Sequence, residues 1–579
     1  MTSSTLAPAA PGSPGSARSR WHAVLARPIT WPALAGLGLG LLALGPGLAP
    51  GFLLSYDMVF VPRMPFSAAL IGLTGGPPRA VPSDALVAIA SLAIPGEVVQ
   101  KIVLLLIFVL ACSGAARMLP DGAPLTARLA AGVCYAWNPY VAERLLIGLW
   151  ALLLGYAGLP WVVRMLGTSP ARPPGLAWAT RLLCVLLPAA VGGFAAMGVT
   201  AVAAVPAALI SGGGRARRLL IVLADMALLS LIWVIPALVE GVTTDPRGVD
   251  AFAARADTPF GRLGSLIMLS GIWNSQTVPS GYGGWGSAVW LLVVIASLGG
   301  LILLARPRQL RDSLAVAGLA GLAIAAIGIT APGRAALRGL VTAWSGFAVL
   351  RDGQQFLAPL ALAVATGLGA LVMWLAVRPE RGQPEQGQPE QDQQSASRPR
   401  RPQRAVTALT VMAVLAPVVL LPGMAWGSAG RLRPAEYPAN WSRAQRIIDG
   451  DPASGTVLLL PWGAYRRYPW NGGEAVFDPW SRLLGREVIF NDGLQVGRLS
   501  LNQESPDSIR LNRIVTRPGP LTTPLRSAGV LFVIIDAGPL LGRAAPGLAA
   551  RAQLPGAQLV LASQDLVVFR LPAAAGRPG

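Results

Sequence analysis

One aspartate just after the first long apolar run is the leading candidate for proton chemistry. Asp57 stands in the segment Ser55-Tyr56-Asp57-Met58-Val59-Phe60-Val61-Pro62-Arg63, about one helical turn beyond the end of that run. Charged groups at the boundary of a membrane are costly and are usually functional or paired. Asp57 would serve as a general base that takes a proton from a hydroxyl group, and Arg63 as an anion contact. An interfacial Asp57–Arg63 pair that only ends the helix explains the spacing equally well.

Two further segments place charges beside apolar runs. Asp84 is a weaker candidate for substrate binding, because it or Ser83 would equally cap a short helix expected over 85–94. Glu143 and Arg144 lie in what we expect to be a tight outer turn between two spans. They are candidates for substrate binding, and a local ion pair is the alternative.

A third segment, 351–356, precedes a late apolar run and supplies Arg351, Asp352 and Gln355. Arginine suits bidentate recognition of phosphate because its guanidinium is planar and always charged. Arg351 is therefore a candidate phosphate ligand, with Asp352 and Gln355 as polar neighbours. The alternative is that Arg351 is an interfacial anchor.

An aromatic and basic segment near the C-terminus is a candidate acceptor site. It runs from Leu460 to Gly473 and contains Trp462, Tyr465 and Trp470. Aromatic faces beside arginine and asparagine suit a carbohydrate, and they would also suit packing against another part of the chain. Both interpretations stay open.

Composition removes several classes of active site. Lys101 is the only lysine among the 47 basic residues, and His22, in the N-terminal tail, is the only histidine. A Walker-type phosphate loop lacks its lysine, and a catalytic triad or a His-rich metal site lacks its histidine. The three cysteines lie in apolar runs with no zinc-ligand spacing. The remaining candidates for a catalytic base are a few carboxylates, and Asp57 is the first of them.

The elements that would position these residues are membrane helices. The chain of 579 residues is 53% hydrophobic and only 13% charged, with a mean hydropathy of +0.55, whereas soluble domains carry about 25% charged residues. Eleven apolar runs are long enough, or nearly so, to span a bilayer. These runs are 31–54, 98–116, 126–140, 145–166, 181–196, 197–212, 218–239, 287–305, 313–330, 354–377 and 405–427. We divide the run 181–212 into two short spans, and a single long helix is the alternative.

Arginine placement predicts the orientation and explains the net charge of +20. The short loops on one side are rich in arginine and those on the other are mixed, which places the N-terminus in the cytoplasm. The charge is thus no sign of nucleic-acid binding. We expect a polytopic α-helical membrane protein with a C-terminal extracytoplasmic α/β domain. The expected parts are a disordered cytoplasmic tail (1–30), a membrane domain (31–377), a flexible cytoplasmic linker (378–404), a last span (405–427) and the outer domain (428–579).

This layout resembles the GT-C class of membrane glycosyltransferases. More narrowly, the segments 56–62, 135–144 and 350–356 resemble actinobacterial arabinofuranosyl- and mannosyltransferases that use polyprenyl-phosphate sugars. The resemblance implies that Asp57 acts as the catalytic base and that Arg351 or Arg63 stabilises the leaving phosphate. Many members carry two adjacent acids where this chain has Asp57 alone. The resemblance leaves a divalent metal open, assigns no metal ligands and implies no other cofactor.

The resemblance also implies partners and a location. They are a polyprenyl-phosphate-linked sugar, an envelope glycan or glycolipid acceptor, and the lipid bilayer of the plasma membrane. Two other functions remain open on the sequence. A transporter or flippase for lipid-linked envelope precursors would place charges inside its spans, and here Asp225 is the main one. A non-catalytic scaffold of envelope biosynthesis is the other.

Overall fold

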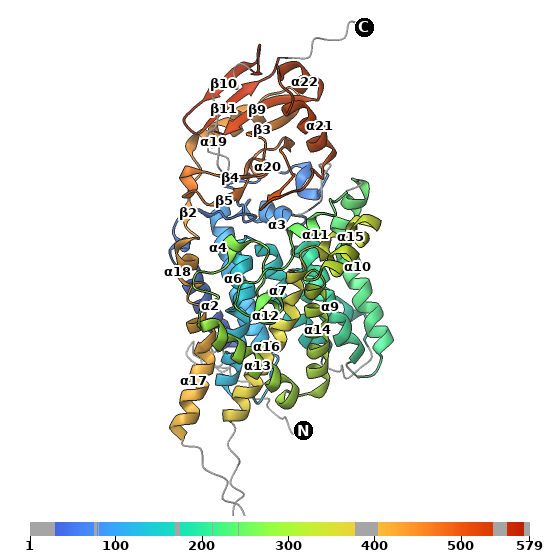
Figure 1. Ribbon diagram of the computed structural model, residues 1–579, viewed down its shortest axis with the longest axis vertical. Coiled ribbons are helices and arrows are strands. Elements are labelled where there is room, and N and C mark those ends of the chain that lie inside the picture. The colour runs from blue at the N-terminus through green and yellow to red at the C-terminus, as the bar shows by residue number, and fades with distance from the viewer. Residues whose placement is uncertain are drawn as a thin grey trace, which may run out of the picture.

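A computed structural model describes residues 29–73, 78, 80–167, 174–210, 212–240, 243–376, 403–536 and 553–572. Residues 1–28 of the tail expected at 1–30, and residues 378–402 of the linker expected at 378–404, lie outside these residues. A bundle of long helices forms one end of the molecule, and a smaller domain of strands and helices covers its other end (Figure 1).

The bundle consists of apolar helices. Eight are long and apolar enough to cross a membrane, and two shorter apolar helices accompany them, so the chain is a multi-pass membrane protein. The helices of the bundle are α2 (Thr30–Leu44), α4 (Gly96–Ala116), α5 (Leu125–Ala136), α6 (Pro139–Leu146), α7 (Trp150–Gly167), α8 (Leu176–Val191), α9 (Gly193–Ile210), α10 (Arg215–Val239), α13 (Gly286–Leu304), α14 (Arg308–Ile327), α16 (Ala358–Ala376) and α17 (Gln403–Leu420).

The division of 181–212 into two helices is confirmed. Helix α8 ends at Val191 and α9 begins at Gly193, whose φ of +71° is in the left-handed region that glycine adopts without strain. The chain therefore reverses its direction between two helices, as the arginine pattern requires.

The expected turn around Glu143 and Arg144 is wrong. The chain breaks at Trp137–Asn138, and residues Pro139–Leu146 form helix α6. Asn138 starts this helix because its side chain accepts a hydrogen bond from the backbone N–H of Val141 at 3.2 Å, with Pro139 in the first turn. Glu143 and Arg144 consequently lie on a buried helix and not in a loop.

Helix α16 lies in the middle of the bundle and is buried along nearly its whole length. It contacts α13, α5 and α14, and small residues allow these helices to approach closely. A Cβ atom on Gly367 would lie 1.9 Å from the carbonyl oxygen of Ser297, so α16 and α13 can touch only with glycine there.

The segments between the helices on the side of the C-terminal domain are short elements and turns. They are η1 (Gly45–Leu48), β1 (Phe52–Leu53), η2 (Ala68–Ile71), α3 (Ser83–Ala90), α11 (Gly248–Ala251), α12 (Gly261–Ile267), η3 (Ser275–Thr277), α15 (Ala331–Ala343), η4 (Ser345–Leu350), η5 (Gly353–Leu357) and α18 (Ala425–Gly430). Asp57 and most other candidate residues lie in or beside these segments.

The C-terminal domain is built on a mixed five-stranded sheet in the order β10-β11-β9-β3-β6. Strand β3 is parallel to β6 and β9, while β11 is antiparallel to β9 and β10. Its elements are β2 (Pro434–Ala435), α19 (Ala439–Asp449), β3 (Thr456–Leu460), β4 (Tyr465–Arg467), η7 (Pro469–Asn471), β5 (Ala475–Phe477), α20 (Trp480–Leu483), β6 (Val488–Ile489), β7 (Gln495–Val496), β8 (Leu499–Ser500), α21 (Pro506–Val515), α22 (Thr522–Ser527), β9 (Val530–Asp536), β10 (Gln558–Ala562) and β11 (Leu566–Arg570). The expected α/β domain is confirmed.

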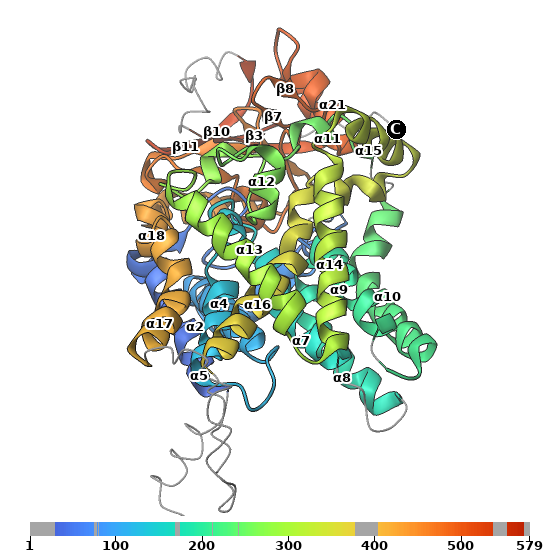
Figure 2. The ribbon, with the colours of Figure 1, turned by 60° about the horizontal axis from the view of Figure 1, so that its bottom comes forward.

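The C-terminal domain is joined to the bundle by strands and aromatic rings. Strand β1 pairs with β2, and the Tyr437 hydroxyl donates to the carbonyl oxygen of Phe60 at 2.8 Å. The Phe52 ring meets the Tyr437 ring edge to face, with ring centroids 5.4 Å apart. Figure 2 shows the strands of this domain directly over the ends of the membrane helices. The domain thus covers one end of the bundle.

A buried charge cluster of Arg466, Asp478 and Asp536 lies inside the C-terminal domain. The Arg466 guanidinium forms ion pairs with both carboxylates, and all three side chains are at most 1% exposed. Tyr468 and Trp480 also donate hydrogen bonds to Asp536, at 2.8 Å and 3.2 Å. Burial, with the nearby Asp478 carboxylate, raises the pKa of Asp536 to about 7.

This pKa predicts a pH dependence of the domain. An acid with a raised pKa binds more protons folded than unfolded, so stability is greatest at low pH and falls as the pH rises from about 4 to about 7. We expect the free energy for opening β9 to fall by up to about 4 kcal/mol across this range. Hydrogen exchange of β9 in the full chain measures this opening free energy, and in the Asp536→Asn variant it should not change with pH. The same slope with pH in the variant and in the unmodified chain would show that other groups cause the dependence.

Candidate functional site

The carboxylate of Asp57 lies where the membrane domain meets the C-terminal domain. Its side chain is half-buried, and its Oδ1 atom accepts a hydrogen bond from the Tyr465 hydroxyl at 2.6 Å. Tyr465 is 408 positions away, on β4 of the C-terminal domain. The backbone N–H of Asp57 donates to the carbonyl oxygen of Ile147 at 3.1 Å, just beyond α6. Both domains therefore fix the position of this carboxylate.

Tyr56, the residue before Asp57, clamps the loop against the C-terminal domain. Its backbone N–H donates to Ala475 at 2.6 Å, and its carbonyl accepts from Phe477 at 2.8 Å, which forms a bridge to β5. Tyr56 has a φ of +44°, a strained value for a residue with a side chain. Its hydroxyl donates to Oε1 of Gln276 at 2.6 Å. A strained backbone persists only where surrounding contacts hold it in place, and here the hydrogen bonds of Tyr56 to the C-terminal domain and to Gln276 do so.

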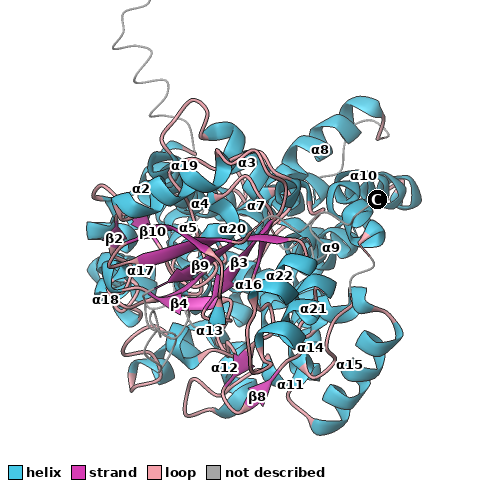
Figure 3. Ribbon diagram, turned by 90° about the horizontal axis from the view of Figure 1, so that it is seen from above, coloured by secondary structure: helices cyan, strands magenta, loops and turns pink. Residues whose placement is uncertain are grey.

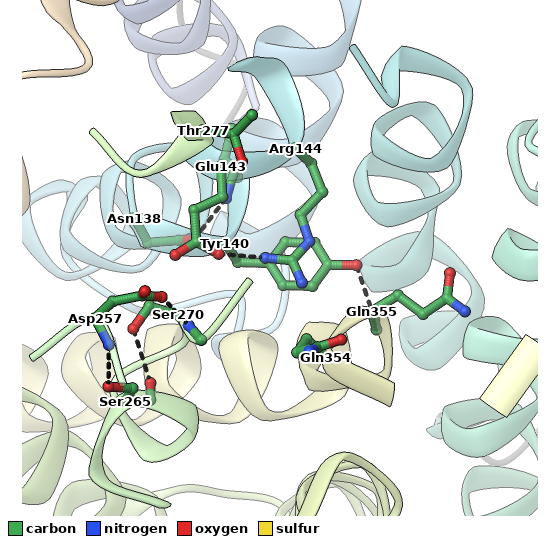
Figure 4. A network of polar contacts seen from close by, with 12 residues as sticks. Asn138, Tyr140, Glu143, Arg144, Asp257, Ser265, Ser270, Thr277, Gln354 and Gln355 are labelled. Carbon is green, nitrogen blue, oxygen red and sulfur yellow. Dashed lines mark hydrogen bonds and ion pairs between the residues drawn. The ribbon is translucent and has the colours of Figure 1, made fainter. Parts of the chain in front are cut away.

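Beneath the loop lies a buried polar network on helix α6 (Figure 4). Arg144 forms an ion pair with Glu143 at 2.8 Å, and its guanidinium lies over the ring of Tyr140 at 4.1 Å from the centroid. The Tyr140 hydroxyl donates to the carbonyl oxygen of Gln355 at 2.8 Å. The local ion pair that the sequence left open is thus present. The network fixes α6, on whose end the backbone of Asp57 rests.

Glu143 is the most constrained acid of this network. It is fully buried, and within the described residues its Oε1 atom has no hydrogen-bond partner. Burial raises its pKa well above the ordinary value, and the nearby carboxylates of Asp257 and Asp352 add to the effect. Asp257 is held by its own loop, where the N–H of Gly271 donates to its carboxylate at 2.7 Å. Glu143 is accordingly a buried acid that Arg144 holds on helix α6.

The residues expected to bind phosphate lie in different surroundings. Arg351 forms an ion pair with Glu504 at 3.1 Å and lies over the ring of Phe252, so it joins the membrane domain to the C-terminal domain. The Gln355 amide donates to the carbonyl oxygen of Val349 at 2.8 Å. These contacts hold the turn before α16.

Two other candidates from that group are placed as follows. Asp352 is half-buried, and burial raises the pKa of its carboxyl. Arg63 is exposed. Arg351 contacts Glu504 in the segment after β8, whereas Asp57 contacts Tyr465 on β4. Strands β4 and β8 lie over different parts of the bundle (Figure 3), so Arg351 and Asp57 contact different parts of the C-terminal domain.

Asp84 also joins the two domains. Its carboxylate pairs with Arg482 of helix α20 at 2.6 Å, and burial raises its pKa although the guanidinium opposes the effect. Neither Asp84 nor Ser83 caps α3, which begins after Pro82 with no side-chain capping bond. The pair is mostly buried and anchors α20 to the first outer loop.

The three aromatic residues expected at an acceptor site have three different environments. Tyr465 contacts Asp57. Trp470 packs against Tyr437, Trp441 and Tyr468 in an aromatic group of the C-terminal domain, and Tyr437 of this group contacts Phe52 of the membrane domain. Trp462 donates to the side chain of Asn512 at 2.9 Å within the C-terminal domain. Only Tyr465 is thus placed beside the candidate base.

The carboxylates do not fit a metal site. Among the described residues, no group of three or more His, Cys, Asp or Glu side chains is placed to hold a metal ion. Tyr465, which donates to Asp57, presents a hydroxyl group, whereas hard divalent cations prefer several carboxylate or carbonyl oxygens. We therefore derive no step through a metal.

The sequence reasoning missed residues that lie around Asp57. Gln276 accepts from both Tyr56 and Arg467, and Arg431 donates to the carbonyl oxygens of Gln276 and Val278. A signal was available for Arg431, because it closely follows the last apolar run, on the side where the expected orientation disfavours arginine. Nothing in the sequence pattern singles out Gln276.

Comparison with solved structures identifies the class of fold. The chain is similar to the cryo-EM structure of arabinofuranosyltransferase AftD from mycobacteria, with a TM-score of 0.54 and 17% identity over 96% of this chain. A mutant of that enzyme gives a TM-score of 0.55 and 16% identity over 97% of this chain. The fold is therefore GT-C-like, as the sequence resemblance implies.

The similarity has clear bounds. This chain spans 40% of the length of the AftD chain that it matches. No protein-family model and no curated protein sequence matches it. At this identity, the comparison defines the fold, and the chemistry has to be argued from the site.

Proposed function

We propose that this chain is a membrane glycosyltransferase that transfers a sugar from a polyprenyl-phosphate donor to a cell-envelope glycan or lipid acceptor on the outer face of the plasma membrane. The observation that carries the proposal is the half-buried Asp57 carboxylate, held by Tyr465 where the two domains meet. The GT-C-like fold supports it. The orientation with a cytoplasmic N-terminus and an outer C-terminal domain is part of the proposal.

The reaction proposed is an inverting transfer. Asp57 takes the proton from an acceptor hydroxyl as the hydroxyl oxygen attacks the anomeric carbon of the donor sugar. The bond from that carbon to the phosphate oxygen breaks, and its electron pair leaves with the lipid phosphate. No covalent enzyme intermediate is required, which suits a site whose nearest side chains are a carboxylate and a phenol.

Tyr465 positions the base in this mechanism. Its hydroxyl donates to Oδ1 of Asp57, which fixes the orientation of the carboxylate and favours its ionised form. Replacing Tyr465 with phenylalanine removes that donor, and a hydrogen bond to a charged group contributes about 1.5–3 kcal/mol. We expect kcat/KM for transfer to fall roughly 10- to 100-fold. As the pH is lowered, this variant should lose its activity at a higher pH than the unmodified chain.

The matched control is Tyr437→Phe, which removes another tyrosine hydroxyl that bridges the domains but binds a backbone carbonyl. A merely structural role for Tyr465 would give both variants the same pH profile. A fall in activity that begins at a higher pH in Tyr465→Phe than in Tyr437→Phe would show that Tyr465 positions the base. The same pH in both variants would show that it only attaches the domains.

The test of the proposed function uses the purified full chain in lipid nanodiscs with a radiolabelled polyprenyl-phosphate sugar and an envelope glycan extract. Transfer of label into the glycan fraction is the expected result. A transporter or flippase would instead carry a fluorescent polyprenyl-phosphate sugar across the bilayer of a sealed vesicle without forming product. A scaffold would do neither. Translocation without transfer, or no transfer with any of a panel of donor sugars, would overturn the proposal.

A further inference from the structure

A small polar cavity lies at the junction of the domains beside the Asp57 loop. Its volume is about 240 Å³. Three parts of the chain line it: the first outer loop, the segment after the last membrane helix, and the turn between β4 and β5. The lining residues are Leu54, Ala429, Gly430, Arg431, Arg433, Asn471, Gly472 and Glu474.

The charge of this cavity is predominantly positive. Arg431 and Arg433 line it, and in the described part of the chain neither forms an ion pair. Arg431 donates to the carbonyl oxygen of Val278 at 3.2 Å, and Arg433 to that of Gly430 at 2.5 Å. Carbonyl oxygens orient a guanidinium without neutralising its charge. Arg351 and Arg482, by contrast, are already paired with carboxylates.

The backbone behind the cavity is strained. Trp426, Gly427, Ser428 and Ala429 have φ values of +57°, +67°, +50° and +58°, a left-handed turn. Each residue with a side chain costs roughly 1–2 kcal/mol in this conformation, and strain of this kind concentrates at ligand sites. The turn directly precedes Arg431, so it sets where the guanidinium groups point.

The position of the cavity connects the membrane surface with the candidate base. Helix α17 ends at Leu420, so Arg431 and Arg433 follow the last apolar helix by 11 and 13 residues. Arg431 and Arg467 both contact Gln276, by its backbone and its side chain respectively, and the same side chain binds Tyr56 next to Asp57. A group held in this cavity would therefore lie close to both the bilayer boundary and Asp57.

We propose that this cavity binds the phosphate group of a lipid, namely the polyprenyl phosphate of the sugar donor. The assignment rests on the proposed function. Guanidinium groups recognise phosphate through paired, charge-assisted hydrogen bonds, and Arg431 and Arg433 come soon after the end of the last apolar helix at Leu420, where we expect the phosphate groups of lipids. Glu474, the one acid in the lining, opposes an anion and would ease its release after transfer.

The test measures binding of polyprenyl phosphate without sugar to the purified full chain by native mass spectrometry. Arg433→Gln should weaken binding roughly 10- to 100-fold, because a hydrogen bond to a charged group is lost. Glu474→Gln should tighten it severalfold, because a like charge is removed. The control is Arg443→Gln, an exposed arginine on α19 that is not among the lining residues, and it should leave binding unchanged.

The sign of the Glu474→Gln effect is the sharpest readout, because an unphosphorylated sugar or a cation would bind less tightly when this carboxylate is removed. Weaker binding in that variant, or unchanged binding in Arg433→Gln, would overturn the proposal. Phosphatidylglycerol and inorganic phosphate serve as competing probes. If phosphatidylglycerol competes as well as polyprenyl phosphate, the cavity binds bilayer lipids. If inorganic phosphate competes equally well, the cavity binds free anions. Either result contradicts the assignment to the sugar donor. Since binding needs no turnover, a chain that binds but transfers nothing would refute the proposed function alone.

Discussion

Replacing Asp57 with asparagine should nearly abolish sugar transfer while leaving the chain folded. General base catalysis contributes about 100- to 10,000-fold to rates, and asparagine has no basic oxygen to take the acceptor proton. The amide oxygen of asparagine still accepts the hydrogen bond from Tyr465, so the loop geometry is retained. We expect kcat to fall about a thousandfold with little change in KM for the donor.

The measurement is the initial rate of label transfer by purified protein in nanodiscs. The control is Asp507→Asn on α21, which removes a carboxylate from an exposed ion pair with Arg510 in the same domain as Tyr465. That variant should transfer at the rate of the unmodified chain. Full transfer by the Asp57→Asn variant, with its thermal unfolding unchanged, would show that the carboxylate is not the base.

The architecture of this protein is largely readable from its sequence, because hydropathy and arginine placement are local signals. The division at Gly193 was predictable from the arginine-rich loops that follow. The break at Asn138 was not, because the apolar run continues through it and only the asparagine–proline pair marks a new helix start. The sequence pattern therefore predicts a loop at Glu143, which lies on a buried helix.

The site was predictable only in part, for a reason of distance along the chain. Asp57 stands out from its own neighbours, whereas its partner Tyr465 is 408 positions away. Arg351 and Asp84 resemble substrate ligands in sequence, yet each pairs with a residue of the C-terminal domain. Which charged residue meets a substrate and which meets another domain is decided by tertiary packing, and no local pattern records it.

The largest effect on stability should come from removing Arg466, which alone compensates two buried carboxylates. Replacing it with methionine leaves Asp478 and Asp536 fully buried beside each other without a cation. Breaking a buried ion pair from one side costs about 3–5 kcal/mol, so hydrogen exchange in the full chain should show β4, β5 and β9 opening more readily by that amount. The loss should be smaller at low pH, since protonation of Asp536 removes part of the uncompensated charge.

Two further variants separate this electrostatic cause from simple loss of packing. Adding Asp478→Asn to Arg466→Met should restore part of the stability, because one uncompensated charge is then absent. Arg443→Met, at an exposed arginine of the same domain, should change the opening free energy by less than about 0.5 kcal/mol. A loss in Arg466→Met that neither falls at low pH nor is relieved by Asp478→Asn would mean that shape, and not charge, holds this core together. The position of β4, and with it Tyr465 against Asp57, depends on that core, so the same variant should also lower transfer under conditions in which it stays folded.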